Sequence, residues 1–176
     1  MGLLMRVFKQ DRPPAEALAG LDRDERVTAW ATTPSGDVAV ATPRGLWLAE
    51  GAAGRRRLAW NDIHKATWGD DVLTIVPGVE VEPGVVVDAP HLRLQLAEPR
   101  DLPAEVRSRV TRSVAYSTHH TLPGGGVRIV ARRVPGVDGL TWVLRFDEGT
   151  DRADPEVRQR AAELLDDARA VGDVPH

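Results

Sequence analysis

Cysteine is missing from this chain of 176 residues, and lysine occurs only twice, at Lys9 and Lys65. Without cysteine there can be no disulfide, no thiolate zinc site and no cysteine nucleophile. A chain of this length still buries enough surface to hold a core without a disulfide or a metal. The formal charge of −3 is too small to indicate a general polyanion partner, so we do not expect nucleic acid as a partner.

Long apolar runs are missing as well. No window approaches the roughly 18 apolar residues that identify a membrane span, and residues 1–14 have neither the apolar core nor the cleavage site of a signal peptide. Serine is scarce, and no serine lies in the Gly-x-Ser-x-Gly context of a nucleophile elbow. We therefore expect a cytoplasmic protein without a catalytic serine.

What is present, from residue 26 to residue 96, is a series of short alternating strands separated by turn residues. The pattern predicts four strands up to residue 60, with turns at 34–37 and 43–45, and three more strands up to residue 96, with a hairpin turn at 69–71. Residues 79–81 and 85–87 are expected to form only edge pieces, because prolines surround them. A helix is predicted over 101–115, with a proline in its first turn and valines repeating every four residues.

Between the two groups of strands, Trp60 to Ile63 predicts one tight turn. The side chains of Asn61 and Asp62 hydrogen-bond readily to nearby backbone groups and favour such bends. The turn would direct both Trp60 and Ile63 towards the core.

Residues 116–176 carry a second, smaller pattern. His119, His120 and the glycines at 124–126 are expected in a loop, followed by a hairpin of strands at 127–133 and 140–146. Asp154 is predicted to cap a helix that ends near Gly172. Because a lone hairpin with one helix is only marginally stable, we expect this ββα unit to dock on the first domain or on a second subunit.

The first part of the chain resembles bacterial pleckstrin-homology-like domains. The motifs that carry the resemblance are LDRDERV at 21–27, TPRGLWL at 42–48 and LAWNDI at 58–63, the last followed by ATW at 66–68 and LTI at 73–75. The resemblance covers residues 1–115, and the remainder resembles an uncharacterised actinobacterial protein. The implied fold is α+β and mostly β: a half-open barrel of two packed antiparallel sheets capped by a helix, plus a C-terminal hairpin and helix. We accordingly divide the chain into a lead-in (1–25), a pleckstrin-homology-like domain (26–116) and a ββα extension (117–176).

Members of that superfamily that bind phosphoinositides carry a basic cluster in and beside the first loop between strands. Here the loop spans 32–37, holds no lysine or arginine and ends in Asp37. A phosphate-rich headgroup needs several cationic donors at that place. We therefore do not expect a phosphoinositide as the ligand.

The densest basic run is Arg55, Arg56 and Arg57. Such a run can contact an anionic membrane or a nucleic acid. More often it is a solvated strand entry with one arginine packing its stem against the protein. The run is a candidate binding site, and it supports a peripheral membrane association that we do not favour.

Charge is also distributed unevenly along the second half of the chain. Residues 100–133 are rich in arginine, including Arg128 and Arg132. In residues 134–176, acidic residues outnumber arginines. Opposite signs on two segments indicate either pairing within one chain, between the last helix and the basic hairpin, or head-to-tail association of two chains. Arg128 and Arg132 are therefore candidate binding residues.

Tryptophan is the preferred aromatic residue, with five tryptophans against two phenylalanines and one tyrosine. Trp30 and Trp47 lie opposite the aliphatic neighbours of their strands, so at least one of them is a candidate for an exposed interface position. The alternative is that tryptophans, Trp142 above all, form a second small core under the ββα unit.

Neither a metal site nor a cofactor nor a catalytic group is predicted. Neighbouring residues of a strand point apart, so His119 and His120 do not make a metal pair, and no partner lies at ligand spacing. The glycines at 124–126 lead into a strand and not into a phosphate-binding helix.

We interpret the chain as a non-enzymatic binding or scaffold module whose partner is a protein or a second copy of itself, as in a homodimer. The alternatives are an anionic-membrane module, and an enzyme of unrecognised type, which would need a deep pocket with convergent His119, arginine and aspartate groups.

Overall fold

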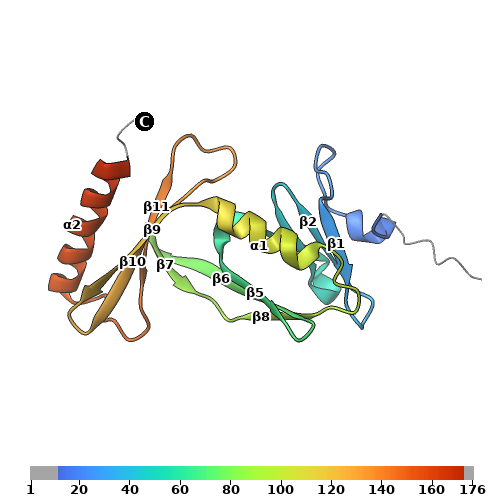
Figure 1. Ribbon diagram of the computed structural model, residues 1–176, viewed down its shortest axis with the longest axis horizontal. Helices are drawn as coiled ribbons and strands as arrows, with labels where there is room; N and C mark the ends of the chain where they lie inside the picture. Colours follow the sequence, from blue (N-terminus) through green and yellow to red (C-terminus); the bar gives the residue numbers. More distant parts are fainter. Residues whose placement is uncertain (1–11, 173–176) are drawn as a thin grey trace, which may run out of the picture.

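The computed structural model describes residues 12–172 and shows a mostly β architecture of two sheets and two α-helices, which confirms the predicted fold class (Figure 1). The strands are β1 (Ala29–Thr32), β2 (Val38–Thr42), β3 (Gly45–Ala49), β4 (Arg55–Ala59), β5 (Ile63–Gly69), β6 (Val72–Glu82), β7 (Val85–Asp88), β8 (Leu92–Gln95), β9 (Val114–Leu122), β10 (Gly125–Arg132) and β11 (Thr141–Phe146). The helices are α1 (Leu102–Ser113) and α2 (Pro155–Gly172), with short 3-10 turns η1 (Ala15–Leu18), η2 (Gly51–Ala53) and η3 (Trp60–Asp62). Residues 1–11 of the predicted lead-in lie outside the described residues.

The first sheet has the order β1-β2-β3-β4 and is antiparallel throughout. The predicted hairpins at 34–37 and 43–45 are confirmed, since Thr32 pairs with Val38 and Thr42 pairs with Gly45. The predicted tight turn is also confirmed as η3, and it leads directly into the second sheet. Trp60 and Ile63 are both buried, as expected.

The second sheet is mixed and curls into a half-barrel, with the order β5-β6-β7-β11-β10-β9 and with β8 paired to β6. Strand β6 is eleven residues long, and it pairs with strands in both halves of the molecule. Its first half pairs with β5 and β8, and its second half pairs with β7. The pairing of β7 with β11 is parallel, with Leu144 opposite Val85 and Arg145 opposite Val86.

The prediction of edge pieces is wrong for residues 85–87, because β7 lies inside the sheet between β6 and β11. Residues 79–81 continue β6 and, among the described strands, pair only with β7, so they do lie at an edge. Pro83 and Gly84 are accommodated in the turn between β6 and β7, where a missing ladder N–H is harmless. Pro83 therefore marks the hairpin turn, whereas Pro77 lies within β6 opposite Ile63.

The predicted end of the helix at residue 115 and the predicted loop at His119 and His120 are also wrong. Helix α1 ends at Ser113, whose hydroxyl donates to the Val110 carbonyl at 2.7 Å. Strand β9 begins at Val114 and contains both histidines, and Gly125 and Gly126 already belong to β10. Residues 114–122 include two threonines, one valine and one tyrosine, which fit a pleated strand better than a helix or loop.

Three hydrophobic clusters hold the molecule together. The largest lies between the first sheet, the β5–β6 hairpin and α1, and includes Leu46, Ile75 and Val106. The second lies between α2 and strands β9, β10 and β11, on the left of Figure 1, and includes Ile129 and Leu144. The third is small and lies around Ala17, Trp30 and Val40. Each fully buried aliphatic side chain contributes about 1.5–3 kcal/mol to stability.

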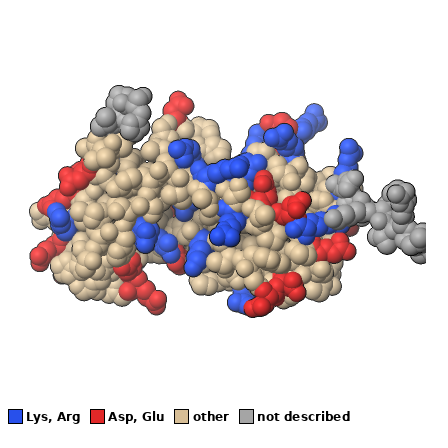
Figure 2. All heavy atoms as spheres, in the orientation of Figure 1, with Lys and Arg blue, Asp and Glu red and all other residues tan. Residues whose placement is uncertain are grey.

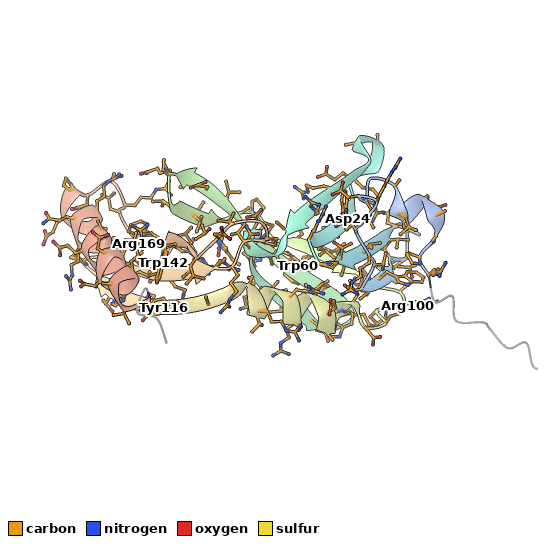
Figure 3. All side chains as sticks on the ribbon, turned by 90° about the horizontal axis from the view of Figure 1, so that it is seen from above. Asp24, Trp60, Arg100, Tyr116, Trp142 and Arg169 are labelled. Carbon is orange, nitrogen blue, oxygen red and sulfur yellow. The ribbon has the colours of Figure 1, made fainter. Side chains whose placement is uncertain are left out.

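Helix α2 begins and packs as predicted. The Asp154 carboxylate accepts hydrogen bonds from the backbone N–H groups of Glu156, at 2.8 Å, and Val157, at 3.3 Å. The buried face of the helix is Val157, Ala161, Leu164 and Ala168. Trp142 and Tyr116 meet beneath the helix with ring centroids 5.4 Å apart (Figure 3). Trp142 therefore contributes to the second core.

Candidate functional site

The three arginines of the basic run on β4 are all engaged within the molecule. Arg55 donates to the Val38 carbonyl at 2.9 Å, and Arg56 pairs with Glu50 at 2.8 Å. Arg57 lies over the Trp47 ring, 5.5 Å from its centroid, and approaches the Glu25 carboxylate at 3.7 Å. These contacts compete with any external anion, so this geometry gives little support to a membrane site on β4.

The two candidate tryptophans are not exposed anchors. Trp30 is 7% exposed and lies in the third cluster, with the Arg100 guanidinium 3.9 Å from its ring centroid. Trp47 is half-buried, and its ring N–H donates to Glu25 at 2.9 Å. The exposed tryptophan is Trp68, at 41%.

The structure does bring Arg128 and Arg132 together, and it adds Arg145. On β10, Val127 and Ile129 face α2, so Arg128 and Arg132 point to the opposite side of the sheet. Arg145 lies on β11 directly opposite Arg128 in the antiparallel register, and faces the same way. We call the surface formed by Arg128, Arg132 and Arg145 the arginine face.

Asp88 supplies one counter-charge to the arginine face. Its carboxylate accepts hydrogen bonds from Arg145 and from Nδ1 of His64, the latter at 2.6 Å. Burial raises the pKa of Asp88, but these two bonds outweigh burial and leave the pKa below its ordinary value. Burial lowers the pKa of His64 more than the bond to Asp88 raises it. The two shifts favour a neutral His64 ring beside an ionised Asp88 carboxylate.

Arg132 is the most buried of the three arginines, with 7% of its surface exposed. Its guanidinium donates to the Ser113 hydroxyl at 2.7 Å. Burial lowers the pKa of Arg132, as does the charge of Arg145, whereas Asp62 raises it. Burial raises the pKa of Asp62 in turn, although Arg132 and His64 oppose that effect. No carboxylate of the described residues forms an ion pair with Arg132 or Arg128.

Three adjoining hollows run along the arginine face. The middle one, about 80 Å³, shares Arg128 and Arg145 with a larger hollow of about 790 Å³. It shares His64 and Arg132 with a third hollow of about 270 Å³. Together they form a trough that crosses the sheet on the side away from α2.

Two histidine–aspartate pairs lie near this trough. His64 bonds to Asp88, and Nε2 of His119 bonds to Asp147 at 2.7 Å. Asp147, with Arg128 and Arg145, lines the largest hollow, so arginine and aspartate groups do converge there. Within residues 12–172, however, no serine or threonine hydroxyl hydrogen-bonds to either ring, and no three acidic or histidine side chains gather as a metal ion requires.

The edge of the second sheet is formed by β9, which pairs only with β10 among the described strands. In Figure 3, β9 continues from α1 along the outer side of the sheet and carries Tyr116. Its nine residues read VAYSTHHTL and contain no lysine, arginine, acid, proline or glycine. Ser117 and His119 of this strand point towards the arginine face, where Ser117 accepts a bond from Arg128 at 3.4 Å.

The acidic C-terminal helix does not neutralise the basic hairpin. Its carboxylates pair along the helix, Glu163 with Arg160 and Asp166 with Arg169, and Arg158 reaches Glu82. Figure 2 shows acidic side chains at the α2 end of the molecule and several basic side chains across the middle. The predicted pairing within one chain is therefore not found among residues 12–172.

Sequence reasoning missed Asp62, His64, Asp88 and Arg145 as members of the site. A usable signal was the hairpin at 127–146, because its strict alternation places Arg128, Arg132 and Arg145 on one face. His64 and Asp88 gave no such signal, since His64 lies on β5 and Asp88 on β7, and Asp88 reaches Arg145 through the parallel pairing of β7 with β11.

No helix within residues 12–172 is long and apolar enough to cross a membrane. In comparisons with known proteins, no family model, no curated protein and no solved structure matches this chain.

Proposed function

We propose that the chain is a non-enzymatic binding module of the cytoplasm that associates with a second copy of itself through strand β9. We also propose that residues 26–116 are a pleckstrin-homology-like domain and that residues 117–176 form the extension that carries the pairing strand. The observation that supports self-association is the nature of the β9 edge.

An unpaired strand edge offers a row of backbone N–H and C=O groups to any other strand. Proteins usually blunt such edges with charged residues, proline, bulges or short length. The other edges here follow that rule. Strand β4 carries its three arginines, β5 carries Lys65 and β8 carries Arg93, and the part of β6 that pairs only with β7 carries Glu80 and Glu82. Strand β1 has only four residues, and Thr32 at its end bridges to Glu98. Among the strand edges in residues 12–172, only β9 is both long and free of lysine, arginine and acidic residues.

The composition of β9 favours pairing. Threonine, valine and tyrosine fit a pleated surface, and the outward residues on the arginine face include no lysine, arginine, acid or large aliphatic side chain: Ala115, Ser117, His119 and Thr121. An antiparallel pair of β9 strands has two-fold symmetry, so the same patch serves both copies and the assembly closes as a dimer. The sheets of the two copies would then join into one.

The test is the mass in solution, measured by light scattering or sedimentation equilibrium over a range of concentrations. The expected result is a particle of twice the chain mass of 19.2 kDa. The double variant Ala115→Lys with Thr121→Lys puts two charges on the exposed edge and should give a monomer. The matched control, Thr67→Lys with Gln95→Lys, adds the same charge to exposed positions of β5 and β8 and should remain a dimer.

A monomer for the wild-type chain, or equal dissociation by both double variants, would rule the proposal out. Co-sedimentation with anionic vesicles tests the alternative. Membrane binding that is lost when Arg55, Arg56 and Arg57 are replaced by alanine would favour a lipid module instead.

A further inference from the structure

The middle hollow of the arginine face has an unusual lining. Its charged or titratable walls are Arg128, Arg132, Arg145 and His64, and it contains no carboxylate. Its volume of about 80 Å³ is several times the ~10–15 Å³ that one water molecule requires. The hollow therefore has room for an ion of several atoms, and its walls are donors.

The arginines are held close to one another at an energetic cost. Arg128 and Arg145 are direct partners on neighbouring strands, where like charges destabilise the pairing. Arg132 is buried on the same face, with Ser113 as its only side-chain hydrogen-bond partner among the described residues. A guanidinium has five N–H donors, and a buried charge is tolerated when it is paired.

The nearby acids do not offset these charges fully. Asp88 is occupied by Arg145 and His64. Asp62 lines the neighbouring hollow with Arg132 and makes no hydrogen bond to it. Arg128 has only the long contact of 3.4 Å to Ser117. Two guanidiniums, those of Arg128 and Arg132, thus remain without an ion-pair partner in residues 12–172.

We propose that the middle hollow binds a tetrahedral oxyanion, a phosphate group, between Arg128, Arg132 and Arg145. A dianion would neutralise the two arginines that lack an acidic partner. It would also reduce the electrostatic repulsion between Arg128 and Arg145. Guanidinium forks match the geometry of phosphate oxygens and form short, charge-assisted hydrogen bonds with them. Donors reach the hollow from β9, β10 and β11, which suits a tetrahedral group better than a flat carboxylate. This site lies on the arginine face and does not depend on self-association through β9.

The test is calorimetric titration of the full chain with inorganic phosphate, at an ionic strength held constant with chloride. We expect one phosphate per chain and a rise in the unfolding temperature with phosphate concentration, as mass action requires. Arg128→Gln and Arg132→Gln should each weaken binding at least tenfold. The matched control Arg93→Gln removes an exposed arginine from β8 and should bind as the wild type does.

Arg128→Gln is the decisive variant, because Arg128 is half-buried and its replacement leaves the core intact. Two further titrations identify the molecule that supplies the phosphate group. One uses phenyl phosphate, as a free phosphate monoester, and the other uses a short phosphoserine peptide. Tighter binding of either than of inorganic phosphate would name the class of natural ligand. Binding of acetate as tight as that of phosphate, no binding of phosphate, or equal losses in Arg93→Gln and Arg128→Gln would overturn the proposal.

Discussion

The indole N–H of Trp60 donates a hydrogen bond of 2.9 Å to the backbone carbonyl of Thr42. Both residues are buried, and the bond ties the turn between the two sheets to the end of β2. It gives the turn a polar anchor inside the largest hydrophobic cluster.

Replacing Trp60 by phenylalanine should therefore destabilise the protein by about 1–3 kcal/mol, because the ring still fills most of the space but the Thr42 carbonyl loses a donor. Urea unfolding followed by circular dichroism measures the change. Trp68→Phe is the control, since Trp68 is exposed, and its change should stay within about 0.5 kcal/mol. Equal effects of the two substitutions would contradict the assigned role of the bond.

Gly78 should not tolerate a side chain. A Cβ atom placed on Gly78 would lie 2.2 Å from Nε2 of His64, whose ring is buried and fixed by Asp88. We expect Gly78→Ala to cost about 1–3 kcal/mol, as overpacking does. Gly69→Ala is the matched control on the neighbouring strand, where nothing lies within 4 Å of the added atom. Unfolding curves that rank Gly69→Ala as the worse substitution would refute the packing argument.

Acidification should destabilise the protein through His64. Burial lowers the pKa of His64 below its ordinary value of 6.5, an effect that Arg145 and Arg132 reinforce and Asp88 opposes. The unfolded chain thus takes up this proton at a higher pH than the folded protein does. The contribution of His64 to stability is complete above about pH 6.5 and is lost as the pH falls towards the folded-state pKa.

The measurement is the free energy of unfolding at about pH 7.5 and about pH 5.5, for the wild-type chain and for His64→Gln. The wild-type chain should lose more stability over this interval than the variant, because the variant has no proton to take up at this position. Equal losses of stability in the two proteins would show that His64 does not contribute to the pH dependence of unfolding.

Removing residues 127–176 should yield insoluble protein. The truncation deletes β10, β11 and α2, so β9 loses its strand partner and the apolar residues Leu122 and Val85 lose their cover. The soluble fraction after expression measures this, and a chain that ends at residue 172 retains every described element as the control. A soluble, folded fragment of residues 1–116 would show that the first part stands alone.

Local signals explain why much of the fold was predictable. The turns at 34–37 and 69–71 and the cap at Asp154 are set by residues adjacent in the chain, and all are found. The error at 114–122 has a physical origin as well. Val106, Val110 and Val114 continue a helical repeat, whereas Ser113 ends the helix and the valine and threonines that follow favour a strand.

The site was less predictable, because it depends on pairings between distant segments. Arg128 and Arg132 were identified from local charge density, but Arg145 joins them only through the register of β10 with β11. Asp88 reaches Arg145 only because β7 lies parallel to β11. At least one of Trp30 and Trp47 was expected to be exposed, and Trp30 is buried because η1 and Arg100 cover that side of the first sheet.

The parallel pairing of Val85 with Leu144 has a consequence for synthesis on the ribosome. Strand β7 emerges long before β11, so one side of β7 stays unpaired until nearly the whole chain has been made. Contacts between distant segments form slowly because loop closure costs entropy. The first sheet can form first, because its strands pair with their immediate neighbours in the chain. The arginine face forms last, when the C-terminal hairpin pairs with the free edge of β7.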